Sequence, residues 1–283
     1  RRKGVEVRAV PAEQGRIPVE RIVAAMDGRT KLVTAPTVGF SPGFRTRTAP
    51  LAEACRAKGA FFLLDAAQSV GIVDTDVGEL GCDALAVAAQ KGLMAFYGAG
   101  FLYCRRAAAE SLLPAGLGRY GVTFGPGVGE TAVEGVDFEY AAAARRFDSG
   151  NFNYLGFLAA ATSMSLLQEV GSARVDAHAR GLARRLAEGL ERVGLPVCGG
   201  LDAPDRVHIV TVGRPGEGGH DTSSDPAIRS FHRFLTDEGV VLSIRRGVLR
   251  FSFHVYNSES DVDRILDLAG RWAASEPLPE ARG

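Results

Sequence analysis

The sequence predicts an α/β protein whose mostly parallel sheet is covered by helices and is followed by a smaller α+β domain. Up to about residue 170, short apolar runs typical of buried strands alternate with longer segments of helical period. Such alternation favours a parallel sheet with helices on its faces. Beyond that point the order becomes helix, strand, helix, strand, strand, helix. We therefore expect a large domain over residues 1–171 and a small one over residues 172–283.

The elements of the large domain follow from these patterns and from turn residues. The expected strands cover residues 4–10, 31–35, 61–64, 83–88 and 100–104. The expected helices cover residues 18–26, 49–58, 107–113 and 157–170. Pro18 suits a first helical turn, and Gly59 is placed as a C-terminal cap. Residues 114–139 are rich in glycine and are expected to form a long loop.

The small domain has clear helix and strand patterns. Its helices are expected at residues 175–193 and 226–239, and its strands at residues 207–212, 240–244 and 248–253. Residues 214–225 are polar and read as a loop. Ser258 followed three residues later by Asp261 is typical of a helix start, and it predicts a final helix.

The composition describes an ordinary globular chain of 283 residues, with 46% hydrophobic residues and no formal net charge. A balanced charge argues against nucleic-acid and membrane partners, which usually require a basic surface. No apolar run reaches the ~20 residues of a membrane span, and the charged start of the chain is unlike a signal peptide. Four scattered cysteines argue against a metal site or a disulfide framework and fit a reducing cytoplasm.

Three polar residues follow two predicted strands at one edge of the sheet. Asp65 ends one apolar run, Gln68 comes soon after it, and Lys91 ends the next run. Ligands of open α/β sheets bind beyond the carboxyl ends of the strands, so these side chains are expected to meet. Lysine can supply a neutral, nucleophilic amine, which arginine cannot. Taken singly, each residue also has an ordinary interpretation as a capping, turn or surface residue.

This stretch resembles the class-V aminotransferase family, which includes cysteine desulfurases, isopenicillin-N-epimerase-like proteins and kynureninases. The resemblance is carried by DAAQSVG at residues 65–71 and AAQK at residues 88–91. It continues in RRFDSGNFN at residues 145–153 and LRFSFHVYN at residues 249–257. It implies the fold of pyridoxal-phosphate-dependent transferases, similar to aspartate aminotransferase. It also implies pyridoxal 5′-phosphate as the cofactor, an amino acid as the substrate and a homodimer as the assembly.

The resemblance also implies roles for individual residues. Lys91 is identified as the lysine that forms the Schiff base with the cofactor. Asp65 would face the pyridinium nitrogen, which makes the ring an electron sink. Gln68 would face the phenolic oxygen. Gln90 stands where the family often has histidine, and its amide can still donate a hydrogen bond to a phosphate.

Residues further along the chain complete the implied site. Gly150 and Asn151 lie in the turn that reaches the partner subunit's phosphate in dimeric members of the family. Arg250 matches the arginine that holds the substrate carboxylate. Its own setting agrees, because an arginine within an apolar strand is costly unless it meets an anion. Arg245 and Arg246 lie nearby and are weaker candidates for the same role.

The chain also departs from the family pattern. Ala88 replaces a serine that would bind phosphate, and Phe40 and Ser41 stand where an asparagine is frequent. The turn after Lys91 is altered. The family's opening segment, which supplies the ring-stacking residue and a phosphate-binding turn, does not precede Arg1. We therefore expect the chain to be a fragment of a longer protein.

These observations favour a pyridoxal-phosphate-dependent enzyme, most simply an aminotransferase. An epimerase or a C–S or C–C lyase of the same family is an alternative. Desulfuration through a loop cysteine is disfavoured, because residues 240–249 contain none. A cofactor-free relative that serves as an interaction protein is a second alternative. A nucleotide-binding protein is a third, but the only similar glycine pattern, at residues 98–100, precedes a strand instead of a helix.

Overall fold

The computed structural model describes residues 4–124 and 137–275. Its main sheet contains β1 (Leu32–Pro36), β2 (Phe61–Asp65), β3 (Ala84–Ala88) and β4 (Gly100–Cys104), in that order. The first three strands are parallel, and β4 runs antiparallel to β3. The predicted α/β class with a mostly parallel sheet is confirmed.

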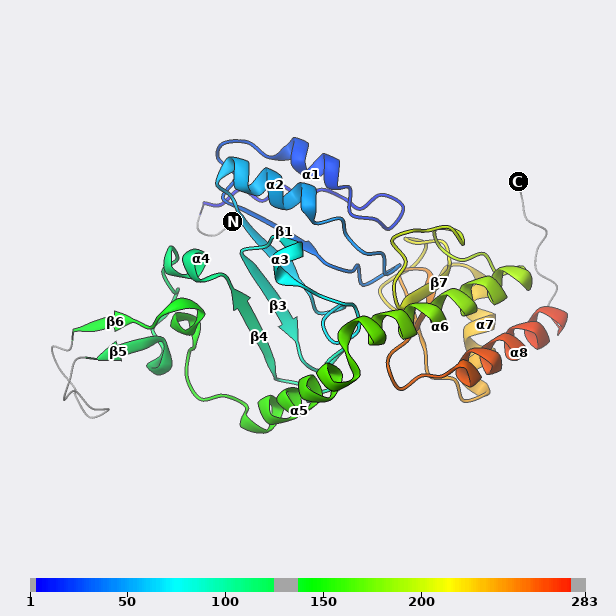
Figure 1. The fold of residues 1–283 in the computed structure, drawn as a ribbon. Helices are drawn as coiled ribbons and strands as arrows, with labels where there is room; N and C mark the ends of the chain where they lie inside the picture. The colour runs from blue at the N-terminus through cyan, green and yellow to red at the C-terminus, as the bar shows by residue number, and fades with distance from the viewer. Residues whose placement is uncertain (1–3, 125–136, 276–283) are drawn as a thin grey trace.

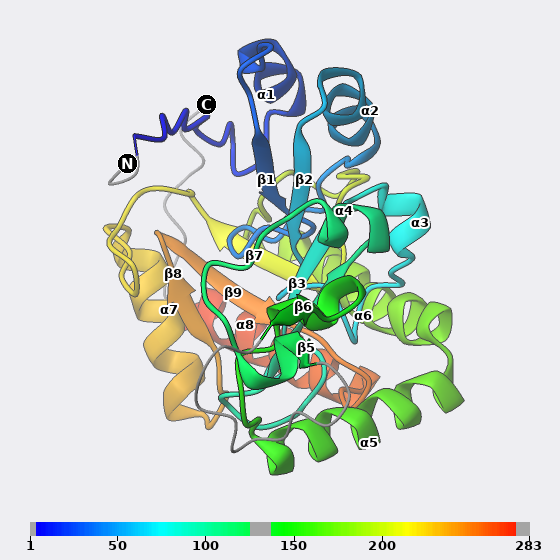
Figure 2. The ribbon, with the colours of Figure 1, turned by 90° about the vertical axis from the view of Figure 1, so that its left-hand side faces the viewer.

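Both faces of the main sheet are covered, as successive residues of β2 show. Phe62 and Leu64 belong to a buried cluster with residues of α1, α2 and α5. Phe61 and Leu63 point the other way and pack on a smaller cluster that includes residues of α4. Helices α1 and α2 lie side by side (Figures 1 and 2). These covering helices are α1 (Val19–Ala25), α2 (Ala49–Lys58), α4 (Arg106–Glu110) and α5 (Tyr154–Val170).

The C-terminal part of the chain is built around a second, antiparallel sheet with the strand order β7-β9-β8. Its strands are β7 (Ile209–Gly213), β8 (Ser243–Arg245) and β9 (Val248–Ser252), and its helices are α6 (Ser172–Arg192), α7 (Pro226–Asp237) and α8 (Glu259–Ser275). Phe231 and Trp272 stack in its core with ring centroids 4.8 Å apart. Figure 1 shows this part beside the main sheet, linked to it by α5 and α6. Gly171 separates the two helices, and the domain boundary there stays a prediction.

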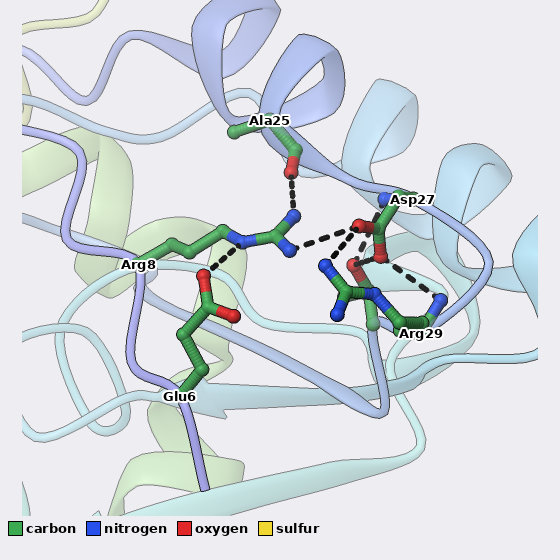
Figure 3. A network of polar contacts seen from close by, with 6 residues as sticks. Glu6, Arg8, Ala25, Asp27 and Arg29 are labelled. Carbon is green, nitrogen blue, oxygen red and sulfur yellow. Dashed lines mark hydrogen bonds and ion pairs between the residues drawn. The ribbon is translucent and has the colours of Figure 1, made fainter.

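The predicted strand over residues 4–10 is wrong. This segment pairs with no other strand in the part of the chain that the structure describes. Polar contacts hold it instead: Arg8 donates hydrogen bonds to Glu6 at 2.8 Å, to the Ala25 carbonyl at 2.9 Å and to Asp27 at 2.9 Å. Arg29 also contacts Asp27 (Figure 3). Alternation in sequence fits any extended segment lying on a surface, so the pattern alone cannot distinguish it from a paired strand.

The long loop predicted over residues 114–139 contains more structure than expected. The short 3₁₀-helix η1 (Arg119–Gly121) leads into β5 (Val122–Phe124), which pairs antiparallel with β6 (Phe138–Tyr140). Residues 125–136 of that predicted loop lie outside the described residues. The sequence also missed α3 (Val77–Leu80) and the 3₁₀-helix η2 (Ala143–Phe147), because elements this short show no helical period.

Predicted helix ends are found where the capping residues placed them. Gly59 ends α2 in the left-handed conformation with a φ of 63°. The carboxylate of Asp261 accepts a hydrogen bond from the backbone N–H of Ser258 at 2.9 Å, which closes the first turn of α8. Among the described residues, no helix combines the length and apolarity that crossing a bilayer requires.

Candidate active site

Asp65 and Lys91 lie at the same edge of the main sheet. β2 ends at Asp65, and the parallel strand β3 ends at Ala88, shortly before Lys91. The Asp65 carboxylate accepts a hydrogen bond from the Ala67 N–H at 2.9 Å. Both charged side chains are exposed, and neither is paired with an opposite charge among the described residues. An acid and an amine therefore stand at one edge without neutralising each other.

Two glycines let the loops after these strands pack backbone against backbone. A Cβ on Gly71 would lie 2.2 Å from the carbonyl oxygen of Gly92, and a Cβ on Gly92 would lie 2.2 Å from that of Val70. No side chain fits in either place. The buried ring of His254 also contacts the Gly92 carbonyl, with Nε2 2.8 Å from the oxygen. The backbone next to Lys91 is therefore held from two sides.

Arg250 joins the C-terminal sheet to this edge. Its Nη2 donates a hydrogen bond to Oε1 of Gln68 at 3.2 Å, across 182 residues of sequence. In β9 its neighbours Leu249 and Phe251 point into the C-terminal core. The alternation of a strand therefore turns Arg250 to the opposite face of that sheet, towards the loops of the main sheet. The hydrogen bond thus connects two residues to which the resemblance assigns roles, and those roles stay a prediction.

The charge of Arg250 is poorly compensated. Its Nε is buried and has no hydrogen-bond partner. Burial, together with the nearby positive charge of Arg245, lowers the pKa of Arg250 to about 10. The guanidinium carbon lies 5.4 Å from the centre of the Phe40 ring, and that of Arg245 lies 5.8 Å from the same centre. Two guanidinium groups facing one ring, with a free buried donor, form a setting that attracts an anion.

The remaining predicted residues are less closely connected. Gln90 is half-buried between β3 and Lys91. Asn151 is exposed, and its side-chain oxygen accepts a hydrogen bond from the Tyr120 hydroxyl at 3.3 Å. Gly150 precedes it in the segment between η2 and α5. No hydrogen bond among the described residues links this turn to Asp65, Lys91 or Arg250.

Three residues of the site were not singled out by the sequence. Phe40 appeared only as a departure from the family pattern, yet two arginines contact its ring. His254 is in the LRFSFHVYN motif of residues 249–257, but the sequence does not indicate its contact with Gly92. His208 is 2% exposed at the start of β7, and burial, then Arg250 and His254, lower its pKa to about 3. A histidine next to an apolar strand is the only signal in the sequence that could have indicated it.

Comparisons with known proteins match this chain over most of its length. The model of the class-V aminotransferase family matches residues 1–265. An uncharacterized aminotransferase of Bacillus subtilis, YcbU, is 27% identical over 92% of this chain and 65% of its own length. A probable cysteine desulfurase of Methanothermobacter thermautotrophicus is 29% identical over 94% of this chain and 66% of its own length. The chain thus spans slightly less than two thirds of these two relatives.

The fold is also that of a solved structure. The apo form of a cysteine desulfurase from Thermococcus onnurineus superimposes with a TM-score of 0.79. The two proteins are 23% identical, and the match covers 96% of this chain and 67% of that chain. At this level of identity, the likeness concerns the fold.

Proposed function

Because the chain belongs to the class-V aminotransferase family, we propose that it uses pyridoxal 5′-phosphate to transform an amino acid. The observation that carries the proposal is the hydrogen bond between Arg250 and Gln68. It brings Arg250, the expected substrate-binding residue, next to Gln68, an expected cofactor-binding residue. Arg250 lies in the C-terminal sheet, whereas Gln68 follows a strand of the main sheet.

The side chains present fit the cofactor. The exposed, unpaired carboxylate of Asp65 suits a protonated ring nitrogen, and the exposed, unpaired amine of Lys91 suits an aldehyde. The amides of Gln68 and Gln90 can donate to its oxygens. By the resemblance, Gly150 and Asn151 would supply backbone and amide donors for the phosphate in a partner subunit. We assign the cofactor to this edge on these grounds.

When bound, pyridoxal phosphate withdraws electrons from the α-carbon of an amino acid. Arg250 would bind the substrate carboxylate with two parallel N–H donors, including the Nε that has no partner among the described residues. The Lys91 amine takes and returns the proton at the α-carbon. Asp65 would hold the protonated ring nitrogen of the cofactor.

We propose transamination as the reaction, in line with the name of the family and of its Bacillus relative. A C–S lyase is the second candidate, because other relatives are named cysteine desulfurases. Cys55, Cys82 and Cys104 are buried, Cys198 is half-buried, and none lies in the turn before Arg250. A lyase reaction would therefore have to release sulfur without a loop thiol. Product analysis with amino acids as substrates separates keto acid from sulfide.

We also propose a homodimer, formed partly through an apolar surface on α5. The surface is lined by Met94, Phe96, Leu155, Leu158 and Leu166, around a shallow depression of about 470 Å³. Leu155 and Leu158 are 72% and 65% exposed. Large exposed apolar patches usually mark an interface. The adjacent turn at Asn151 would then face a second subunit.

Two further parts of the proposal concern organisation. The division into residues 1–171 and 172–283 is supported by two buried clusters. Each lies almost entirely within one part, although Val175 joins the main-sheet cluster and Ile72 packs on the C-terminal one. A cytoplasmic location is supported by four cysteines that are all free.

The decisive experiment is spectroscopic. The chain is purified with added pyridoxal phosphate, and its visible absorption is recorded before and after borohydride treatment. We expect a cofactor band that borohydride removes and that is absent in Lys91→Ala. Lys58→Ala, which removes an exposed lysine at the end of α2, should leave the band intact. Absence of the band from the unsubstituted chain at every cofactor concentration contradicts the proposal for this chain.

A further inference from the structure

Arg245 lies on the same face of the C-terminal sheet as Arg250. In the antiparallel pairing of β8 and β9, Ser243 is opposite Arg250 and Arg245 is opposite Val248. Paired residues point to the same side of a sheet, and so do residues two apart in a strand. Arg245 is therefore directed to the side where Arg250 meets the main sheet. Both guanidinium groups lie over Phe40, within the about 6 Å typical of cation–π contacts.

A carboxylate of the protein itself already binds the guanidinium of Arg245. Asp221, in the loop before α7, accepts a hydrogen bond from Nη1 of Arg245. Oδ1 of Asp221 also lies 2.9 Å from Nδ1 of His220, whose ring stacks on Phe40 with centroids 6.3 Å apart. The contact with His220, and then Arg245, lowers the pKa of Asp221, so it is negative at neutral pH. A carboxylate is thus the ligand that this guanidinium holds beside the substrate clamp.

The loop that carries Asp221 is tied to the turn between β8 and β9. The N–H of Arg246 donates to the His220 carbonyl at 3.2 Å, and the N–H of Gly247 donates to the Thr222 carbonyl at 3.0 Å. The buried hydroxyl of Ser223 donates to the Gly247 carbonyl at 2.8 Å. These backbone contacts position the loop without help from Asp221. Its side chain can leave Arg245 while the loop stays in place.

The two arginines differ in how their charges are balanced. Arg245 has Asp221, whereas Arg250 has the neutral oxygen of Gln68 and a buried Nε without a partner. A substrate with one carboxylate would neutralise Arg250. A substrate with two would neutralise Arg250 and could also replace Asp221 on Arg245. Asp221 is 62% exposed, so water and His220 would solvate it after the exchange.

We propose that Arg245 is a second carboxylate-binding residue of the site and that it selects amino acids with an acidic side chain. In this arrangement Arg250 binds the α-carboxylate of the substrate and Arg245 binds its side-chain carboxylate. Without a substrate, the carboxylate of Asp221 binds Arg245 instead. This inference rests on the proposed function and specifies its substrate class. The simpler interpretation is that Arg245 and Asp221 form an ion pair that only anchors the loop.

The two interpretations predict opposite effects for Asp221→Asn. If Asp221 competes with the substrate, its neutralisation strengthens the binding of a dicarboxylate and leaves a monocarboxylate unaffected. If the ion pair only anchors the loop, Asp221→Asn weakens the binding of the dicarboxylate and of the monocarboxylate alike. Arg245→Gln should remove the preference for a dicarboxylate without changing the affinity for a monocarboxylate. The sequence made Arg246 a weaker candidate for carboxylate binding, but its side chain is exposed and has no hydrogen bond or ion pair among the described residues. Arg246→Gln is therefore the matched control.

The test is isothermal titration of the chain, loaded with pyridoxal phosphate, with glutarate and with butyrate. Neither compound has an amino group, so neither reacts. We expect glutarate to bind about tenfold more tightly or better, since an added charge-assisted contact has this order of strength. Arg245→Gln should make the affinities for glutarate and butyrate equal. Arg246→Gln should leave the difference between the two affinities unchanged, and Asp221→Asn should enlarge it. Equal affinities in the unsubstituted chain, or weaker binding of both compounds in Asp221→Asn, overturn the proposal.

The same titrations on chain prepared without cofactor keep this result separate from the proposed function. A dicarboxylate preference in a chain that takes up no pyridoxal phosphate supports Arg245 and contradicts the cofactor proposal. Uptake of cofactor without a preference contradicts the role of Arg245 and leaves the cofactor proposal in place.

Discussion

Arg250 shows at the scale of a single residue how function and stability oppose each other. Its guanidinium is largely removed from water, has Gln68 as its one side-chain hydrogen-bond partner among the described residues, and stands near a second positive charge. Such a group destabilises the folded chain until an anion arrives. The same uncompensated positive charge gives the site its affinity for a carboxylate. The loss of stability and the binding of an anion therefore have one physical origin.

This argument predicts a trade-off for Arg250→Gln. The glutamine amide can still approach Gln68, while the buried charge is gone. We expect the free energy of unfolding to rise by about 1–2 kcal/mol and carboxylate affinity to fall by about 10- to 100-fold. Urea unfolding and ligand titration measure the two quantities. Arg246→Gln, which removes an exposed charge, should change neither by much, and a strongly destabilised Arg250→Gln would contradict this account.

His208 gives a prediction for pH. Its folded-state pKa is lowered to about 3, whereas an unfolded histidine titrates near pH 6.5. Between these values the unfolded chain binds the extra proton, so stability rises with pH and is lost as the pH falls from about 6.5 to 3. The contribution is at most about 1.4 kcal/mol per pH unit.

Unfolding of the unsubstituted chain and of His208→Gln, each measured by urea between pH 7 and pH 4, isolates this contribution. We expect the variant to lose part of the pH dependence. Identical slopes for the two proteins would mean that His208 is not the group responsible.

At the scale of the elements, the loops after β2 and β3 act as one unit because Gly71 and Gly92 are in direct backbone contact. Gly71 has a φ of 93°, which side chains rarely adopt, and the space for a Cβ is taken by a carbonyl group. The position of Lys91 therefore depends on a contact made by its neighbour and not on its own side chain.

Gly71→Ala should disrupt this unit. We expect it to lower the free energy of unfolding by about 3 kcal/mol or more, because strain at positive φ adds to a steric clash. Gly59→Ala is a matched control, since Gly59 has a φ of 63° and nothing within 4 Å of its Cβ position. It should cost only about 1 kcal/mol. Equal losses for the two variants would show that the clash is relieved by movement of the loops.

For the whole molecule, the apolar surface on α5 is the feature best suited to association. A chain with no net charge has little electrostatic repulsion to keep copies apart. Burial of exposed leucines then favours association, at roughly 25 cal/mol for each Å² of apolar surface removed from water.

The homodimer can be tested by sedimentation equilibrium. We expect the unsubstituted chain to associate and Leu158→Glu to shift it towards monomers, because a charge would be buried at the interface. Val241→Glu changes a residue that is 99% exposed away from this surface and should have no effect. A monomeric unsubstituted chain would exclude the dimer for this chain.

Much of the architecture was predictable because the forces that produce it are local. Apolar runs determine the buried strands β2, β3 and β4, and Gly59 and Asp261 determine helix ends through hydrogen bonds within a single turn. The order of strands and helices is enough to favour a parallel sheet. Asp65 and Lys91 follow directly from it, because a residue at the end of a parallel strand has only one edge to occupy.

Only the tertiary structure decided the contacts between segments distant in sequence. Nothing in the sequence around Phe40 indicates that its ring contacts two arginines, or that Asp221 approaches one of them. The extended segment at residues 4–10 has the pattern of a strand, and only the absence of a partner in the described chain distinguishes it. Local sequence patterns indicate which residues are buried and which form turns. Which surfaces meet depends on how the two sheets pack, and that is settled by the sum of many weak contacts across the whole chain.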